Sequence, residues 1–298
     1  MKRINLSTLR LIFYVIAFFS TASSFGQDKS NNLMTTTKEH IIKSSFNNKL
    51  YQLYVSLPRN YIRVDTIHYP VLYVLDGKFS FTSFHSIREV LDLGKEIKDV
   101  IIVAIDDSSQ TDTDWLADRY NDFTFSSIPQ SDTQWSKLMN IPIEKLKSGG
   151  AELFLSTFQN DIIPFIDNHY KTSADRGISG HSLGGLFAGY CLVRKPDLFK
   201  RYSINSPSFW WNNNEMLSLE NSFAKQSKSI SANAFFSAGA LEGEMMIAPM
   251  TAFTNSLKNR DYKGLTMISQ IFDGETHLSV VPACSSRTLK VLYGRNVK

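Results

Sequence analysis

The sequence predicts an α/β fold with a mostly parallel, doubly wound sheet, an antiparallel N-terminal hairpin and helices on both faces. Continuous apolar runs such as "YPVLYVLDG" and "DVIIVAIDD" end in acidic or glycine turns, as is typical of strands covered on both faces. Segments with helical spacing alternate with these runs along the chain. The length of 298 residues and the apolar content of 43% favour one sizeable domain over disorder.

The first 27 residues have the layout of a signal peptide. A basic start precedes an apolar run from Leu11 to Phe19, and small polar residues follow it. We therefore expect residues 1–27 to be cleaved, and the protein to be exported to the periplasm or secreted, with no stable membrane insertion afterwards. An uncleaved membrane anchor is the alternative, although the run is short for a bilayer span. No cysteine follows the run, so a lipoprotein anchor is not supported.

Charge and cysteine content exclude two further classes of protein. The formal net charge of +4 includes Lys2, Arg3 and Arg10, and the remaining chain carries about +1, so nucleic acid is not an expected partner. Cys191 and Cys284 are the two cysteines, which excludes a disulfide framework. Whether they pair is open, but Cys191 falls on the apolar face of a predicted helix, which favours a buried thiol.

The elements of the first half follow one another in the order that this fold requires. Residues 28–38 are polar and predict a flexible leader, so the domain is expected to span residues 39–298. The segment "HIIKSSFNNKLYQLYVSLP" alternates around its two central asparagines, which predicts the hairpin. The helix "FTSFHSIREVLDLG", stopped by its glycine, separates the strands "YPVLYVLDG" and "DVIIVAIDD".

A long excursion interrupts the alternation at about residues 106–150. Such a segment inside a compact domain usually builds the wall of a site. The following stretch "AELFLSTFQNDIIPFIDNHY" predicts a helix, in which Pro164 predicts a kink. Four large apolar residues share one face of this helix: Phe154, Phe158, Ile162 and Phe165.

The second half of the chain continues the alternation. The expected strands are "RGISG", "RYSINSPS", "NAFFSAG" and "TMISQIFDG", with "LGGLFAGYCLVRK" as a helix and further helices between and after the later strands. Ligands of such a sheet bind beyond the carboxyl ends of the strands. A polar motif is therefore a candidate for the site when it lies at one of those ends.

Ser182 is the candidate nucleophile. It lies in the G-x-S-x-G pattern formed by residues 180–184, after a predicted strand and at the start of a predicted helix, which is the context that makes the pattern informative. So tight a turn strains the backbone of the serine, and the flanking glycines remove side chains that would collide. A serine in an ordinary glycine-rich turn is the structural alternative.

His277 is the candidate base. Of six histidines, it alone follows the last predicted strand, in "FDGETHLSVVP". We expect His181, inside the turn, to point away from the hydroxyl. The acid should follow the penultimate strand, where Glu242 lies nearer the strand end than Glu244. Asp273 and Glu275 are rival carboxylates, and a Ser/His pair without a strong acid stays open.

Backbone N–H groups are the candidate oxyanion donors. The residue after the nucleophile, Leu183, would supply one, and the turn after "VLYVLDG" would supply the second, at Gly77 or Lys78. No metal and no organic cofactor is expected.

Together these motifs resemble the Putative esterase family of α/β hydrolases, in the esterase D-like superfamily. The resemblance rests on "YPVLYVLDG", "RYNDFT", "GISGHSLGGLFAGYCLVRKPDLFKRYSINSPSFWW", "GALEGE" and "FDGETHLSVVP", which cover nearly all of the chain after residue 40. The branch it most resembles contains periplasmic siderophore (trilactone) esterases. The resemblance implies the α/β-hydrolase fold, with Ser182 as nucleophile, His277 as base and Glu242 as acid, although some relatives look like dyads.

The resemblance also implies three substrate contacts. Arg119, in "RYNDFT", matches an arginine implicated in holding anionic or catecholate groups, and Trp210 and Trp211 match a tryptophan pair near the site. A salt-bridged arginine and core tryptophans are the structural alternatives.

The expected function is that of an exported carboxylic ester hydrolase acting through an acyl-enzyme on Ser182. Its partner would be a small-molecule or glycan ester, siderophore-like or otherwise bulky. The alternatives are an acyltransferase that uses the same acyl-enzyme and a non-catalytic binding protein on the same fold. The sequence leaves the oligomeric state open.

Overall fold

A computed structural model describes residues 36–61, 66–109 and 111–295 of the chain. The expected signal peptide and most of the expected leader lie outside the described residues. Within them the first strand begins at Thr37, so Thr37 and Lys38 pair in the sheet and the leader prediction ended two residues too late.

One sheet of eight strands forms the centre of this part of the chain, in the order β1-β2-β4-β3-β5-β6-β7-β8. The first two strands pair antiparallel with each other and β2 pairs antiparallel with β4, whereas all later pairs are parallel. The expected hairpin and the mostly parallel sheet are therefore confirmed. The strands are β1 Thr37–Lys43, β2 Leu50–Ser56, β3 Tyr69–Val74, β4 Ile101–Asp107, β5 Thr172–His181, β6 Arg201–Asn205, β7 Ser229–Gly239 and β8 Lys263–Phe272.

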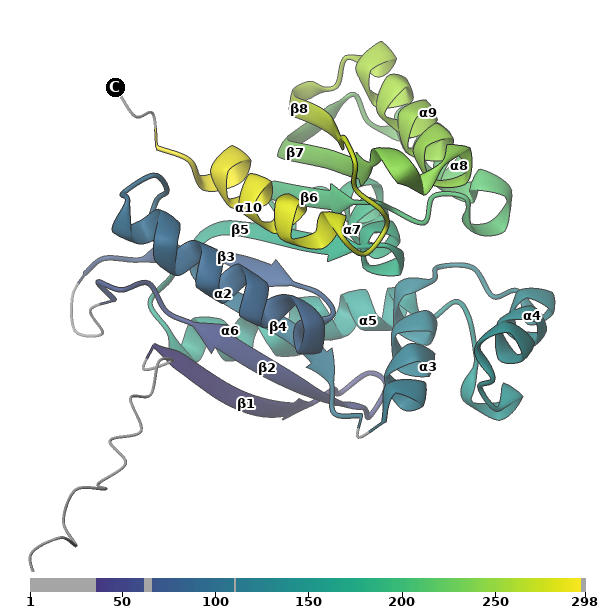
Figure 1. Cartoon of the computed structure of the whole chain (residues 1–298), viewed down its shortest axis with the longest axis horizontal. Helices are drawn as coiled ribbons and strands as arrows, with labels where there is room; N and C mark the ends of the chain where they lie inside the picture. Colours follow the sequence, from purple (N-terminus) through teal and green to yellow (C-terminus); the bar gives the residue numbers. More distant parts are fainter. Residues whose placement is uncertain (1–35, 62–65, 110, 296–298) are drawn as a thin grey trace, which may run out of the picture. The chain divides into compact units, whose positions relative to one another are not determined.

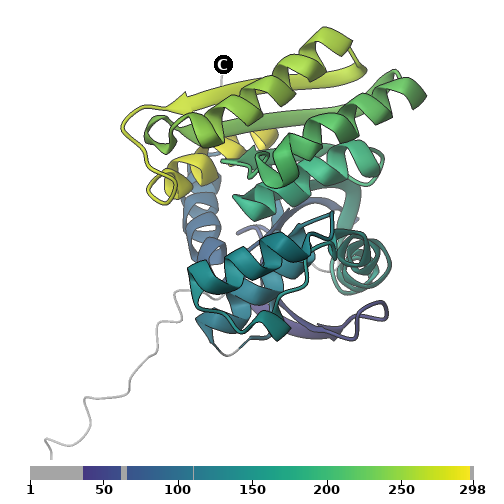
Figure 2. The ribbon, with the colours of Figure 1, turned by 90° about the vertical axis from the view of Figure 1, so that its right-hand side faces the viewer.

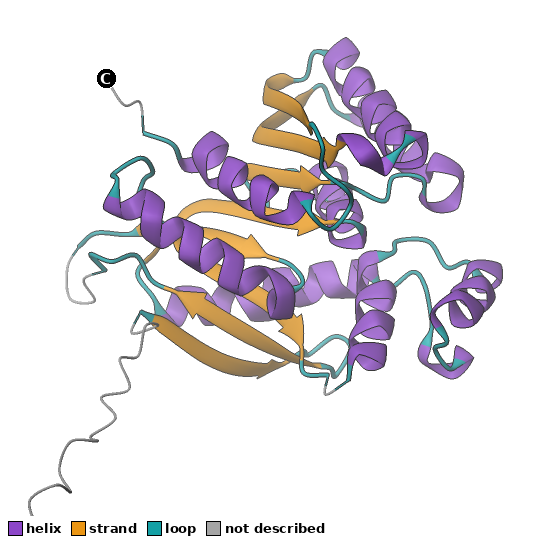
Figure 3. Ribbon diagram, in the orientation of Figure 1, coloured by secondary structure: helices purple, strands orange, loops and turns teal. Residues whose placement is uncertain are grey.

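Helices cover both faces of the sheet (Figures 1 and 3). Two of them, α2 and α10, contact each other and lie on one face, while α7 packs on β5 and β6 from the other. Figure 2 turns the molecule so that these two layers are seen on either side of the sheet. The helices are α2 Gly77–Leu93, α3 Asp112–Phe123, α4 Pro129–Met139, α5 Ala151–Thr157, α6 Ile163–His169, α7 Leu183–Arg194, α8 Trp211–Gln226, α9 Glu244–Arg260 and α10 Val280–Tyr293, with short turns η1 Ile143–Lys145, η2 Phe158–Ile162 and η3 Ala240–Glu242.

The central strands explain why their sequences are apolar without alternation. Val71 and Tyr73 of β3 belong to the core under α7, whereas Leu72 and Val74 of the same strand belong to the core under α2 and α10. All four side chains are almost completely buried. Burial of each contributes about 1.5–3 kcal/mol, and this requirement on both faces produces a continuous apolar run.

The excursion is shorter than expected and is largely helical. Asp106 and Asp107 still belong to β4, and α3, α4 and η1 occupy much of the segment up to Gly150. Figure 1 shows α3 and α4 beyond the carboxyl ends of β3 and β4, which is where a site wall was expected.

The helix predicted after the excursion contains a π-helical turn, η2, between α5 and α6. Pro164 lies in the first turn of α6 and has no N–H group to donate to the preceding turn. The predicted irregularity is therefore present, but it takes the form of a widened turn before the proline. Phe154, Phe158 and Ile162 are buried as their spacing predicts, and Phe165 is partly buried.

Candidate active site

Ser182 occupies a strained turn between β5 and α7. Its backbone has φ 60° and ψ −119°, which a non-glycine residue rarely adopts. A Cβ atom on Gly180 would lie 2.1 Å from the carbonyl oxygen of Gly184, so the chain can turn this tightly only with glycine there. The hydroxyl of Ser182 therefore lies beyond the carboxyl end of a central strand, and its Oγ is 3.5 Å from Oγ of Ser208.

His277 and Glu242 form a hydrogen-bonded pair. Nδ1 of His277 lies 2.6 Å from Oε2 of Glu242, and the histidine ring is about one-third exposed while the carboxylate is fully buried. The two residues come from the loops after β8 and β7, and the N–H of Leu241 donates to the carbonyl of Glu275 between these loops. The histidine ring thus has Nδ1 held by a carboxylate and remains partly exposed.

The carboxylate of Glu242 is fixed by two further donors. Its Oε1 accepts hydrogen bonds from the Ser206 hydroxyl and from the Gly239 N–H, each at 2.6 Å. Burial alone would raise the pKa of Glu242, but the hydrogen bonds from His277, Ser206 and Gly239 outweigh it and lower the pKa. Glu242 is therefore a buried carboxylate that stays charged near neutral pH.

The rival carboxylates do not have this arrangement. Glu244 and Asp273 are exposed, and Glu275 accepts a hydrogen bond from Ser279 instead. Of the carboxylates weighed from the sequence, Glu242 is the one that contacts His277.

The ring of His181 packs against that of His277, with 4.5 Å between ring centroids. Burial and the neighbouring His277 lower the pKa of His181 to about 3, so its imidazole is neutral. Because His181 adjoins Ser182 in the chain, this contact also brings His277 to the nucleophile turn. His181, which the sequence predicts to point away from the hydroxyl, thus has its ring against the candidate base His277.

Two of the expected oxyanion donors begin helices. Leu183 is the first residue of α7 and Gly77 is the first residue of α2, so neither N–H has an intrahelical acceptor. Because β3 and β5 are parallel neighbours, their carboxyl ends bring these two helix starts to the same edge of the sheet. The Lys78 N–H, the other candidate, instead donates to a carboxylate oxygen of Asp106. Gly77 is therefore the candidate that we retain.

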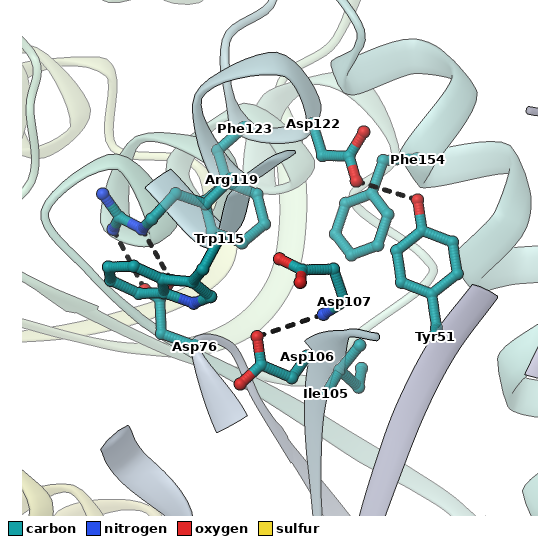
Figure 4. Close-up of a pocket in the computed structure, with 10 residues that line it drawn as sticks. All are labelled: Tyr51, Asp76, Ile105, Asp106, Asp107, Trp115, Arg119, Asp122, Phe123 and Phe154. Atoms are coloured by element: carbon teal, nitrogen blue, oxygen red, sulfur yellow. Dashed lines mark hydrogen bonds and ion pairs between the residues drawn. The ribbon is translucent and has the colours of Figure 1, made fainter. Parts of the chain in front are cut away.

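Arg119 forms a two-pronged ion pair with Asp76. Its Nε lies 2.7 Å from Oδ1 and its Nη2 lies 3.1 Å from Oδ2 of that carboxylate (Figure 4). The guanidinium also lies over the rings of Trp115 and Phe123, at 5.0 and 5.7 Å from their centroids. This arrangement is that of the salt-bridged arginine weighed as the structural alternative.

The two tryptophans differ in exposure. Trp211 is 1% exposed, donates from Nε1 to the Ser126 hydroxyl at 2.8 Å and packs against Tyr120, so it is a core residue. Trp210 is only partly buried, and its Nε1 lies 3.1 Å from the sulfur of Met246. Of the pair, only Trp210 retains surface that a substrate could touch.

Sequence reasoning missed four residues that organise the site. Ser206 holds Glu242, Ser208 lies beside Ser182, Asp76 binds Arg119, and Asp106 holds the Lys78 N–H. Each follows or ends a strand at its carboxyl end, so the rule that points to Ser182 points to these residues as well. The sequence does not show which carboxylate or hydroxyl faces which partner.

The described residues contain no metal site, no membrane-spanning helix and no disulfide bond. No group of three or more histidine, cysteine, aspartate or glutamate side chains among them could hold a metal ion. In the same ranges no helix is both long and apolar enough to cross a membrane. Cys191 and Cys284, both described and both buried, are free thiols, which settles the pairing left open by the sequence.

In sequence, the chain is similar to known esterases. The family model described as "Putative esterase" matches residues 44–242. The curated ferri-bacillibactin esterase BesA of Bacillus subtilis (strain 168) is 30% identical over 268 residues, covering 85% of this chain and 88% of that protein. The siderophore enterobactin esterase of Emericella nidulans is 40% identical over 72 residues, which cover 23% of this chain and 24% of that protein.

Solved structures share the fold. The BES protein from Bacillus cereus superposes with a TM-score of 0.73 at 28% identity, covering 88% of this chain and 97% of that one. Siderophore hydrolase EstA from Aspergillus nidulans gives a TM-score of 0.74 at 22% identity, covering 90% of this chain and 97% of that one. The mostly parallel eight-stranded sheet with helices on both faces is therefore a fold that this chain shares with these solved structures.

Proposed function

Since the chain belongs to the Putative esterase family and is a carboxylic ester hydrolase, we propose that it is an exported serine esterase that works through an acyl-enzyme on Ser182. The observation that carries the proposal is the His277–Glu242 pair at 2.6 Å, whose histidine ring packs 4.5 Å from that of His181, the residue that precedes Ser182 in the strained strand-to-helix turn. A serine hydroxyl is a weak nucleophile unless an oriented base takes its proton, and this pair has the composition of such a base.

The proposed reaction has two halves. Oγ of Ser182 attacks the ester carbonyl carbon while its proton passes to Nε2 of His277. The oxyanion is held by the N–H groups of Leu183 and Gly77. When the tetrahedral intermediate collapses, the alcohol leaves with the proton from His277. Water then repeats the sequence on the acyl-enzyme and releases the acid and the free serine.

Glu242 would serve this cycle in two ways. Its carboxylate accepts the Nδ1 proton of His277, which leaves Nε2 as the nitrogen free to take the serine proton. It also stabilises the imidazolium that forms in each transition state, and burial strengthens that attraction.

The proposed substrates are bulky esters, with siderophore-like esters as the leading class. Two relatives are named as esterases of ferri-bacillibactin and of a siderophore, enterobactin. Three large apolar side chains beside the acid and the base are more than 60% exposed, namely Leu241, Met245 and Leu278. Exposed apolar side chains that lie close in the chain to Glu242 and His277 favour a substrate with a large apolar part.

Export is also part of the proposal and rests on the sequence alone, through the signal-peptide layout of residues 1–27. Finding the protein in the cytoplasm with its N-terminus intact would contradict it.

The test is hydrolysis of acetyl, butyryl and feruloyl esters and a catecholate trilactone by the protein and by Ser182→Ala. Ser222→Ala, an exposed serine on α8, is the matched control and should retain full activity. Serine-dependent release supports the proposal, and the best ester identifies the substrate class. Transferred ester in place of free acid when an alcohol acceptor is supplied would indicate an acyltransferase. Equal release by Ser182→Ala would refute the mechanism.

A further inference from the structure

The turn from β3 into α2 leads to Gly77, the first residue of the helix. Carboxylate interactions hold the residues on either side of Gly77. Asp76 binds Arg119 through both oxygens, and Asp106 accepts the N–H of Lys78. The interactions therefore fix the residue before and the residue after the proposed oxyanion donor.

This turn needs to be held because its backbone is strained. Asp76 has φ 55° and ψ 53°, the left-handed region that costs a non-glycine residue on the order of 1 kcal/mol. The turn also packs closely on the nucleophile helix, since a Cβ atom on Gly184 would lie 3.1 Å from Oδ2 of Asp76. A shift of Asp76 would consequently move the donor relative to Ser182.

The guanidinium of Arg119 is poorly placed to receive an anionic group. Two of its three nitrogens bind Asp76, and the side chains of Arg119 and Asp76 are only 11% and 12% exposed. The cavity that they line has a volume of about 10 Å³, room for about one water molecule. Two further acidic side chains, Asp106 and Asp107, line the same cavity (Figure 4) and offer an anion no positive charge.

We propose that Arg119 is a positioning residue that acts through Asp76 on the oxyanion turn, and is not a ligand for an anionic part of the substrate. The inference rests on the proposed function, because it concerns the donor of that reaction. An oxyanion donor acts only when it lies about 2.7–3.1 Å from the developing charge. Loss of Arg119 therefore weakens transition-state binding, lowering kcat with little change in KM.

The test is a double-mutant cycle of Arg119→Gln and Asp76→Asn, measured on a neutral ester, 4-nitrophenyl acetate, and on an anionic one, mono-4-nitrophenyl succinate. We expect each single variant to lower kcat by about 10-fold to 100-fold on both esters, part of the 100-fold to 1000-fold that one donor contributes. KM should change by less than about threefold, and the double variant should be no slower than the slower single.

Two controls separate positioning from loss of structure. Arg194→Gln removes an exposed arginine–glutamate pair on α7 and should leave kcat unchanged. Arg119→Lys keeps the charge but cannot form the two-pronged pair, so it should recover only part of kcat. If Arg119→Gln does not fold, Asp76→Asn and Arg119→Lys carry the comparison of the two esters.

The outcomes are distinct. A rise in KM confined to the anionic ester, or losses that multiply in the double variant, would overturn the inference and make Arg119 a substrate ligand. No serine-dependent hydrolysis of either ester by the unaltered protein and Arg194→Gln would instead overturn the proposed function, and the inference with it.

Discussion

Replacing Glu242 by glutamine should slow the reaction by on the order of 10,000-fold. Glutamine has nearly the same shape, but it cannot accept from His277, Ser206 and the Gly239 N–H as the carboxylate does. In the transition state the attraction between imidazolium and carboxylate, about 4 kcal/mol at 4 Å in an effective dielectric of 20, is lost. That is about 1000-fold in rate, and the wrong histidine tautomer accounts for the remainder.

The assay is kcat on the best ester of the panel for Glu242→Gln and for the control Glu244→Gln, which removes an exposed carboxylate two residues away. Thermal unfolding of both variants verifies that the fold persists. The control should keep full activity. A loss below about tenfold in a folded Glu242→Gln would refute the reasoning and indicate that Ser182 and His277 act as a dyad.

Three further predictions concern the scaffold. Gly180→Ala should destabilise the protein by more than about 3 kcal/mol, because its Cβ would lie 2.1 Å from a backbone oxygen of the next helix. The control Gly94→Ala, whose Cβ would have no contact under 3.4 Å, should not destabilise it in this way. Equal urea midpoints for the two variants would contradict this prediction. Burial raises the pKa of Asp106 to about 7, so the folded state holds this proton more tightly than the unfolded chain. The stability that the protonated Asp106 contributes should be present below about pH 4 and be lost as pH rises toward 7. In urea unfolding, the free energy of unfolding of the unaltered protein should therefore exceed that of Asp106→Asn by less and less across this pH range. A difference that grows with pH would contradict the prediction. Burial raises the pKa of Cys284 to about 12, and burial also raises the pKa of Cys191 well above its usual value. Neither thiol should therefore react with a disulfide reagent until the protein unfolds, and rapid labelling of the folded protein would contradict their burial.

The sequence predicts the framework well because the framework follows from burial. Strands such as β3 and β4 must be apolar on both faces, and a tight turn around Ser182 requires glycine at position 180, so both leave local patterns. The rule that ligands lie beyond strand carboxyl ends also points to His277 and Glu242, which the structure brings into contact.

The sequence predicts side-chain partners poorly because these depend on elements far apart in the chain. Arg119 and Asp76 are 43 residues apart, and nothing local in either segment indicates that they form an ion pair. The engagement of the Lys78 N–H by Asp106 likewise depends on β4 lying beside β3, which sequence order alone does not show. Trp210 and Trp211 are adjacent and chemically identical, yet only their place at the start of α8 decides that Trp211 is buried.

The most direct test of the central claim is to trap the covalent intermediate. The protein is mixed with a 4-nitrophenyl ester, quenched in acid within milliseconds, and analysed by intact mass and peptide mapping. The account predicts one acyl group on Ser182, formed in a burst of 4-nitrophenol, and no acyl group in Ser182→Ala. Turnover with an acyl group on another residue, or unchanged turnover by Ser182→Ala, would contradict it.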